Sequence, residues 1–185
     1  MPVLDDLFSG DDVRAAAAVE QVTAEHLPAL EARLAGPDPD ARWWAVAGLA
    51  RLGGERATEL LLAAAADADA GLRAAAIFGL GRQAVPSAIP LLIQILDDPS
   101  EYLGRLATDA LIATGKPAVV ALIDTLEHSV QPRIRANAAR ALALIADTSA
   151  IPALFRALED DSSLVAHWAD QGLERMGVGQ VYFKP

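Results

Sequence analysis

The sequence contains no cysteine, which excludes disulfide bonds, zinc–thiolate sites and cysteine nucleophiles. Aromatic residues make up only 5% of the chain although hydrophobic residues reach 53%, so the core must be built from small and aliphatic side chains. No stretch alternates apolar and polar residues at strand period, and residues that favour helices dominate. These features predict an all-α protein that is stabilised by packing alone.

Basic residues are scarce. The chain has 15 Lys and Arg against 25 Asp and Glu, which gives a net charge of −10, and its lysines are Lys116 and Lys184. A nucleic-acid-binding protein needs a basic surface to displace counterions from phosphates. The charge therefore argues against a nucleic-acid partner and favours basic or neutral partners.

Long apolar runs and a signal-like start are also missing. Residues 1–6 lack the basic and apolar regions of a secretory signal. Charges interrupt every apolar stretch before it reaches the roughly 20 residues that cross a bilayer. We therefore expect a cytoplasmic protein without a membrane partner.

What the sequence does contain is a repeat with a period of 31 residues. A leucine recurs five times at this spacing, with an alanine four residues before it and a glycine or alanine one residue before it. Agreement of three registers over five copies indicates an internal repeat. The leucines are Leu49, Leu80, Leu111, Leu142 and Leu173; the alanines are Ala45, Ala76, Ala107, Ala138 and Ala169; the third register holds Gly48, Gly79, Ala110, Ala141 and Gly172.

A second set of residues at the same period precedes the first and predicts another buried helix face in each repeat. Its members are Leu30, Leu61, Leu92, Ile123 and Leu154, with Leu34, Ala65, Leu96, Glu127 and Leu158 four residues later. Each repeat therefore reads as two helices. The expected first helices are 24–35, 55–66, 86–97, 117–127 and 149–159, and the expected second helices are 40–52, 70–83, 101–114, 131–146 and 163–176.

The boundaries of these helices carry their own signals. Pro28, Pro90 and Pro152 fall in the opening turn of a first helix, where proline costs little. Gly53, Gly115 and Gly177 are expected to end second helices in the left-handed conformation. Asp-, Pro- and Gly-rich turns between the helices supply N-cap acceptors.

The two ends differ from the middle, as expected for a stack whose inner repeats expose apolar faces on both sides. We expect an N-terminal capping segment at 1–23, with a helix at 10–22 begun by Ser9 or Asp11. The repeats then occupy 24–177. A tail at 178–185 contains Val181, Tyr182 and Phe183, which are expected to fold back over the last repeat.

The pattern resembles the HEAT-repeat family, and more closely its short bacterial form, which also occurs in phycobilisome-lyase-like proteins. In that family an aspartate in the turn is commonly followed six residues later by an arginine of the second helix. Asp67 and Arg73 match both positions; Arg42 and Arg135 match the arginine alone, Asp98 and Asp160 match the aspartate alone, and Gly104 and Ala166 replace the arginine. The resemblance implies an α-α superhelix, a HEAT-like solenoid of five two-helix repeats with an N-terminal capping helix, whose arginines tie adjacent turns together.

In HEAT-like stacks the second helices line the concave surface, and their outward side follows from the buried registers at 100° per residue. That side mixes aromatic residues near its ends with opposed charges in its middle, as binding surfaces often do. We expect it to bind a protein or peptide. The candidate residues are Trp43, Phe78, Arg105, Asp109, Arg140, His167 and Gln171.

Two other interpretations of this surface remain open. Trp43 and Phe78 could pack on neighbouring helices while the charges pair within the protein. Trp43, Trp44 and Trp168 could instead form a homodimer interface. The uniform spacing would also suit a designed repeat protein, although the varied arginine positions favour a natural origin.

Signatures of catalysis are weak. His26, His128 and His167 lie in different registers, and the chain lacks the His-Glu pairs with which HEAT-like deoxyhypusine hydroxylases bind iron. We therefore expect no metal, no cofactor and a non-catalytic scaffold. The resemblance implies one alternative, because lyase-like relatives handle bilin chromophores. In that case Arg105, Asp109 and Arg140 would hold the propionates and ring nitrogens of a tetrapyrrole.

Overall fold

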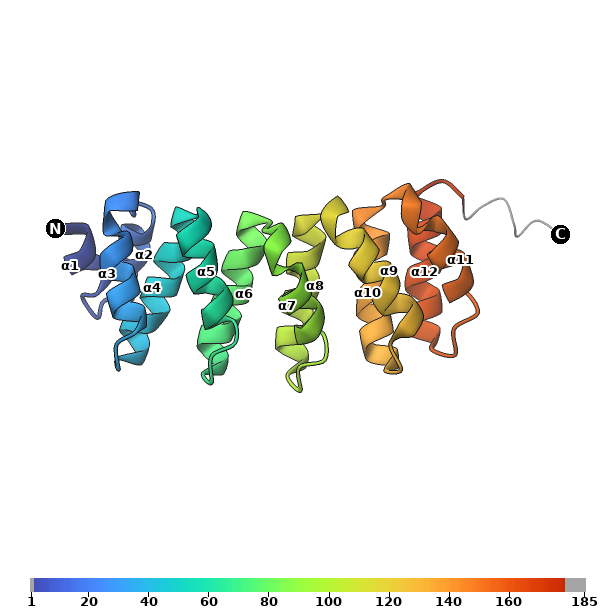
Figure 1. The fold of residues 1–185 in the computed structure, drawn as a ribbon, viewed down its shortest axis with the longest axis horizontal. Helices are drawn as coiled ribbons and strands as arrows, with labels where there is room; N and C mark the ends of the chain where they lie inside the picture. Colours follow the sequence, from blue (N-terminus) through green and yellow to red (C-terminus); the bar gives the residue numbers. More distant parts are fainter. Residues whose placement is uncertain (1, 179–185) are drawn as a thin grey trace. The chain divides into compact units, whose positions relative to one another are not determined.

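The structure is a computed structural model and describes residues 2–178, all of whose regular elements are α-helices or short 3₁₀ helices. The chain divides into two compact units, with the boundary between Gln83 and Ala84. This arrangement of successive helix pairs (Figure 1) is the all-α solenoid that the repeats predict.

The first unit consists of two helix pairs and an N-terminal segment. The segment holds α1 (Pro2–Leu7) and α2 (Asp12–Val19). The first pair is α3 (Leu27–Leu34), which follows η1 (Ala24–His26), and α4 (Pro39–Leu52). The second pair is α5 (Glu55–Ala64) and α6 (Ala70–Gln83). The second helices α4 and α6 pack side by side, and α2 packs on α4.

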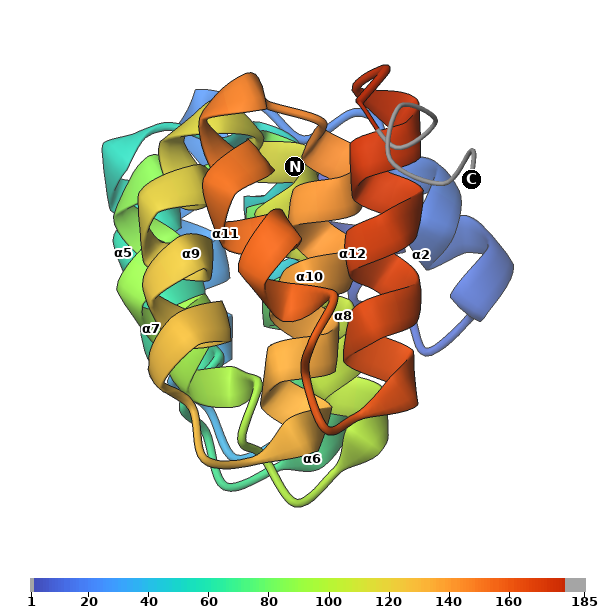
Figure 2. The same ribbon diagram turned by 90° about the vertical axis from the view of Figure 1, so that its right-hand side faces the viewer.

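The second unit holds three pairs. In the first, η2 (Pro86–Ala88) and α7 (Ile89–Ile95) precede α8 (Glu101–Thr114). In the second, η3 (Lys116–Ala118) and α9 (Val119–His128) precede α10 (Pro132–Ile145). In the third, η4 (Thr148–Ala150) and α11 (Ile151–Ala157) precede α12 (Ser163–Arg175). Helix α10 packs against both α8 and α12, so the second helices form one layer. Figure 2 shows α9 and α11 beside one another in the other layer, which is made of the first helices.

Every member of the three leucine, alanine and small-residue registers is buried, which confirms the core predicted for the second helices. In the first helices the leading residues Leu30, Leu61, Leu92 and Leu154 are buried as predicted. Four residues later Ala65 and Leu96 are buried, but Leu34 and Leu158 are only half-buried, and in the fourth repeat the prediction is wrong. There Leu122 and Leu126 are buried, whereas Ile123 is half-buried and Glu127 is exposed. The turn from α8 to η3 and α9 is one residue shorter than its equivalents, so α9 begins one residue early, while the second helices keep their spacing.

The N-terminal segment contains two helices rather than the expected single helix at 10–22. Asp11 begins α2, as expected, because its Oδ1 accepts hydrogen bonds from the backbone N–H groups of Val13 at 3.0 Å and Arg14 at 3.1 Å. Helix α1 was not predicted. Val181, Tyr182 and Phe183 lie outside the described residues.

All five second helices end at a residue with positive φ. Gly53, Gly115 and Gly177 adopt φ values of 70°, 71° and 79°, which confirms the predicted caps. Ala84 and Ala146 occupy the same position in the other two repeats, with φ values of 49° and 54°. This conformation is unfavourable for alanine because of its Cβ atom.

Among residues 2–178, no single helix is both long enough and apolar enough to cross a bilayer. Helix α8 and the segment Lys116–His128 meet the requirement of length and composition only as a pair, and they are bent by 117° relative to each other.

The second helices of successive repeats pack with close approach of their backbones. A Cβ atom on Gly79 would lie 2.7 Å from the Cβ of Ala50, on the neighbouring second helix. A Cβ on Gly172 would likewise lie 3.0 Å from the Cα of Ala143 and 2.9 Å from the Cδ1 of Leu154. The third register therefore holds small residues because rigid neighbouring atoms leave no room for larger ones.

Arginine–aspartate pairs connect successive repeats. The Arg135 guanidinium on α10 donates from Nε and Nη2 to the two carboxylate oxygens of Asp160, at 2.8 and 2.9 Å, and from Nη1 to the carbonyl of Ser129 at 3.0 Å. Across the first unit's two repeats, Arg42 donates from Nη2 to one carboxylate oxygen of Asp67 and from Nε to the carbonyl of Leu34 at 3.1 Å. The family arginine thus bonds to the aspartate 25 residues later, in the next repeat.

This geometry explains the two residues that break the pattern in the middle of the chain. Gly104 stands where an arginine would be, and the residue 25 positions later is Ser129 rather than an aspartate, so both partners of one pair are replaced together. Arg133 occupies the space beside Gly104, because its Nη1 would lie 3.4 Å from a Cβ there. Its Nη2 lies 3.7 Å from Asp97.

The pairs also set the ionisation of their members. Hydrogen bonds from Arg135 hold the pKa of Asp160 below its ordinary value of 3.8, and bonding to Asp160 raises the pKa of Arg135. The pKa of Asp67 is lowered by a hydrogen bond from the backbone N–H of Asp69 and next by Arg42. A carboxylate whose pKa is lowered by folding stabilises the folded state while it is charged.

We expect Gly79→Ala to lower the free energy of unfolding by about 1–2 kcal/mol, because the added methyl group forces α4 and α6 apart at Ala50. Gly104→Ala is the matched control, since its Cβ would meet nothing closer than 3.4 Å. That change should stabilise the protein by up to about 1 kcal/mol through helix propensity. Chemical denaturation followed by circular dichroism measures both, and equal effects would contradict the packing argument.

We expect Asp160→Asn to lower the free energy of unfolding by about 1–3 kcal/mol at neutral pH, because it removes a charged acceptor from Arg135. The folded-state pKa of Asp160 lies below the unfolded value, so this stabilisation is complete above about pH 4 and is lost as the pH falls through the folded-state pKa. The variant and wild type should therefore converge in strongly acidic buffer.

Asp161→Asn is the control for this change. Asp161 also pairs with Arg135, at 2.6 Å, but its side chain is 84% exposed. Its replacement should cost less than about 1 kcal/mol. A loss in Asp160→Asn that did not depend on pH, or an equal loss in Asp161→Asn, would show that the partly buried ion pair of Arg135 and Asp160 is not responsible.

Candidate functional site

The outward side of α4 and α6 carries exposed aromatic residues. The side chains of Trp43 on α4 and Phe78 on α6 are 42% and 57% exposed, respectively. The ring of Trp43 meets the edge of the Trp44 ring, with centroids 4.8 Å apart and an interplanar angle of 87°. Trp43 and Phe78 are thus only partly covered by their neighbours, and much of each side chain faces solvent.

Two hollows flank Trp43. The larger, of about 460 Å³, lies between α2 and α4 and is lined by Asp12, Ala16, Asp40, Trp43 and Trp44. The smaller, of about 220 Å³, shares Asp40 and Trp43 with the first; its other lining residues are Pro39, Arg42, Asp69 and Leu72. Trp43 therefore lines both concave sites, as expected of a residue that anchors a ligand.

The carboxylates of the larger hollow are unpaired. Within residues 2–178, neither Asp12 nor Asp40 accepts a side-chain hydrogen bond or forms an ion pair through its carboxylate. The capping role at their helices is taken by Asp11 and Asp38, which accept the backbone N–H bonds of the first turns of α2 and α4. The negative charges of Asp12 and Asp40 therefore remain available.

Sequence reasoning missed Asp12 and Asp40 as site residues. A signal was present for Asp40, because a residue three positions before Trp43 in a helix lies on the same face as that tryptophan. No such signal existed for Asp12, since its position depends on how α2 packs against α4.

In the second unit, the outward side of the second helices carries the other five candidate residues. The structure pairs two of them, because Arg140 on α10 donates from Nη2 to Asp109 on α8 at 2.8 Å. Gln171 on α12 donates to Glu174 at 3.4 Å. The charges of Asp109 and Arg140 thus form the intramolecular pair that one interpretation of the sequence anticipated.

Arg105, Asp109 and His167 are the exposed candidates of the second unit, and of these Asp109 is held in the ion pair with Arg140. The Arg105 guanidinium carbon lies 5.9 Å from the ring centroid of Tyr102, and no carboxylate in residues 2–178 pairs with it. His167 contacts the edge of Trp168 with centroids 5.5 Å apart. Arg105 is therefore the cation of this surface that is free to meet an anionic group.

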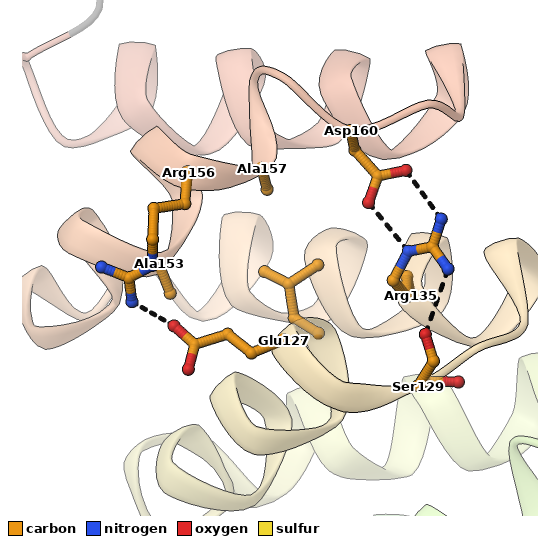
Figure 3. Close-up of a pocket in the computed structure, with 8 residues that line it drawn as sticks. Glu127, Ser129, Arg135, Ala153, Arg156, Ala157 and Asp160 are labelled. Carbon is orange, nitrogen blue, oxygen red and sulfur yellow. Dashed lines mark hydrogen bonds and ion pairs between the residues drawn. The ribbon is translucent and has the colours of Figure 1, made fainter.

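A further hollow, of about 450 Å³, lies on the layer of first helices between α9 and α11 (Figure 3). Figure 3 shows Arg156 paired with Glu127 at one side of it, and Arg135 paired with Asp160 at the other. The rest of its lining is Leu126, Ser129, Ala153 and Ala157. The four charged residues form these two ion pairs, so this hollow offers a ligand no unpaired charge.

The histidines have local structural partners. His26 is 3% exposed, and its Nδ1 accepts a hydrogen bond from the backbone N–H of Thr23 at 3.0 Å. The Nδ1 of His128 lies 3.1 Å from the carboxylate of Asp124. Throughout the part of the chain that the structure describes, no three His, Asp or Glu side chains are placed to hold a metal ion.

Comparison with known proteins agrees with this architecture. The family model for HEAT repeats matches residues 58–129 and 119–181. The model for the PBS lyase HEAT-like repeat matches residues 41–67. A phycobilisome maturation protein from Synechococcus elongatus is 38% identical over 121 residues, which cover 64% of this chain and 58% of that protein. The chain therefore spans less than two thirds of the length of this relative.

Solved structures with a similar fold include several helical repeat proteins. The complex of CpcE and CpcF of phycocyanin lyase from Nostoc aligns with a TM-score of 0.57 at 25% identity, over 81% of this chain and 64% of that chain. Human deoxyhypusine hydroxylase aligns with a TM-score of 0.57 at 20% identity, over 95% of this chain and 72% of that chain, and shows the fold alone.

The match to the HEAT-repeat model extends over residues 58–181, which is more than half of the chain. It coincides with the repeating helix pairs, their buried leucine and alanine registers, and the arginines that bond from one repeat to the next. The chain belongs to the HEAT-repeat family.

Proposed function

We propose that this chain is a non-catalytic scaffold that binds a protein or peptide on the outward side of its second helices. The observation that carries the proposal is the exposure of Trp43 and Phe78 on that side of α4 and α6. Large aromatic residues beside concave sites are the usual anchors of protein interfaces.

The rigidity of the surface supports the same function. Its helices are held by buried alanine and leucine registers and by the arginine pairs between repeats. A surface that is already ordered loses little conformational entropy when a partner binds. The similar phycocyanin lyase structure is itself a complex of two proteins, which supports a protein partner for this chain.

The state of the charged residues supports the non-catalytic part of the proposal. Asp109 and Arg140 neutralise each other, so neither is poised as an acid, a base or an anion clamp. In the first unit, the hollow beside Trp43 is lined by two aspartates and two tryptophans, which recognise cations, and its lining includes no serine, threonine, lysine or histidine.

A second candidate function is the handling of a bilin chromophore. It is supported by the likeness to a phycobilisome maturation protein and to the phycocyanin lyase structure. In that case Arg105 would bind a propionate, and Arg140 would have to exchange Asp109 for the ligand.

The scaffold function predicts that Phe78→Ser loses a partner that the wild-type chain retains. Affinity capture from an extract of the source cell, with quantitative mass spectrometry, should show at least a tenfold loss of that partner. Val120→Ser is the matched control, because Val120 is an apolar residue that is 79% exposed on the first helix α9. Equal retention by Phe78→Ser, or equal loss from both variants, would contradict the proposed surface. Light scattering of the purified chain tells whether the partner is a second copy.

The scaffold function also predicts that the visible absorbance spectrum of a free bilin does not change when the chain is added. A bilin held rigidly by a protein changes its absorbance, so the measurement is a direct one. A shifted band that Arg105→Ala abolishes, and that Lys116→Ala leaves intact, would favour the chromophore function instead.

A further inference from the structure

We propose that the hollow between α2 and α4 is a subsite for an arginine side chain of the partner protein. Its lining residues are Asp12, Ala16, Asp40, Trp43 and Trp44. The inference rests on the proposed function, since it names the chemistry by which the partner is held. It assigns a role to Asp12 and Asp40, which neither the repeat pattern nor the core requires.

The charge of the hollow selects a cation. Asp12 comes from α2 and Asp40 from α4, so two helices each contribute an aspartate to the lining of the same cavity. No cation within residues 2–178 neutralises either one. The arginines nearby in sequence are committed elsewhere, because Arg14 pairs with Asp6 and Arg42 pairs with Asp67.

The positive ends of α2 and α4 do not cancel this charge. Each helix start is already capped by another aspartate, Asp11 in α2 and Asp38 in α4. Those capping carboxylates bind the backbone N–H groups that carry the positive end of the helix dipole. Asp12 and Asp40 therefore add a second negative charge to helix starts at which a capping aspartate already binds two backbone N–H groups.

The aromatic side of the hollow favours a guanidinium over an ammonium group. Trp43 and Trp44 meet edge to face, which leaves part of the Trp43 ring exposed to the cavity. A planar guanidinium stacks on an indole and donates to carboxylates at its rim at the same time, whereas an ammonium group is a compact, strongly hydrated charge. The volume of about 460 Å³ leaves room for the arginine and the adjoining backbone of the partner.

The hollow between α9 and α11 shows what a similar cavity looks like when its charges serve the fold. It has nearly the same volume, and all four of its charged residues pair with one another (Figure 3). The hollow beside Trp43 differs in having aromatic walls and two carboxylates without a pair. That contrast indicates a ligand from outside. It also disfavours a bilin at this place, because propionates and aspartates repel each other.

The test uses the full chain and a defined probe, an acetylated and amidated pentapeptide of alternating glycine and arginine. Peptides with citrulline or lysine in place of arginine are the comparison probes, since citrulline has the shape of arginine without its charge. Binding is followed by the indole N–H signals of the tryptophans in nuclear magnetic resonance spectra. The arginine peptide should shift the signals of Trp43 and Trp44 but leave that of Trp168 in place. It should bind at least tenfold more tightly than the citrulline peptide.

Matched variants separate the subsite from bulk charge. The double variant Asp12→Asn/Asp40→Asn should weaken binding of the arginine peptide at least tenfold. The control Asp170→Asn/Glu159→Gln removes the same charge from exposed residues of the second unit and should change binding less than twofold. Asp40→Asn alone, which leaves α2 intact, should weaken binding at least threefold and serves if the double variant unfolds.

Three results would overturn the subsite. They are equal weakening by the control variant, equal binding of the citrulline peptide, and unchanged Trp43 and Trp44 signals. Equal binding of the lysine peptide would overturn the assignment to arginine. If the arginine peptide fails to bind while Phe78→Ser still loses its partner, the subsite is wrong and the scaffold function stands. If Phe78→Ser keeps its partner while the arginine peptide binds as expected, the failure lies in the proposed surface.

Discussion

The fold depends on how closely neighbouring second helices approach one another. At Gly79 and Gly172, a single added carbon atom would collide with the alanine of the preceding repeat. This constraint explains the composition, because helices that touch through glycine and alanine leave little space for aromatic side chains in the core. It also explains why Trp43 and Phe78 stand on the outside, where they are available to a partner.

Much of the architecture could be predicted from the sequence because it follows from periodicity. The leucine, alanine and small-residue registers identified the buried face of the second helices, and glycines marked three of their ends. The fourth first helix escaped this reasoning. Its shift by one residue follows from the shorter turn before α9, and Ile123 continued the pattern that Leu122 actually fulfils. Ala84 and Ala146 show the converse, since the 31-residue spacing marks them as caps although alanine disfavours that conformation.

Contacts between repeats and between helices were harder to predict. The aspartate and arginine of one repeat lie six residues apart in sequence, but Arg42 and Arg135 pair with an aspartate of the next repeat. Asp109 and Arg140 were candidates for binding and are paired with each other. Asp12 and Asp40 gave no sequence signal as a pair, because only the packing of α2 on α4 brings them to one hollow. Periodicity reveals faces, whereas a binding site depends on which faces meet.

The joint replacement at Gly104 and Ser129 has a consequence for how such chains can be shortened or recombined. Excision of the repeat that contains α9 and α10 would place the helix of Gly104 before the turn that holds Asp160. Asp160 would then lose Arg135 and find no guanidinium in its place. The exchangeable module of this protein is therefore the junction between two repeats, with both halves of its ion pair, and a single repeat is too small a piece to transplant.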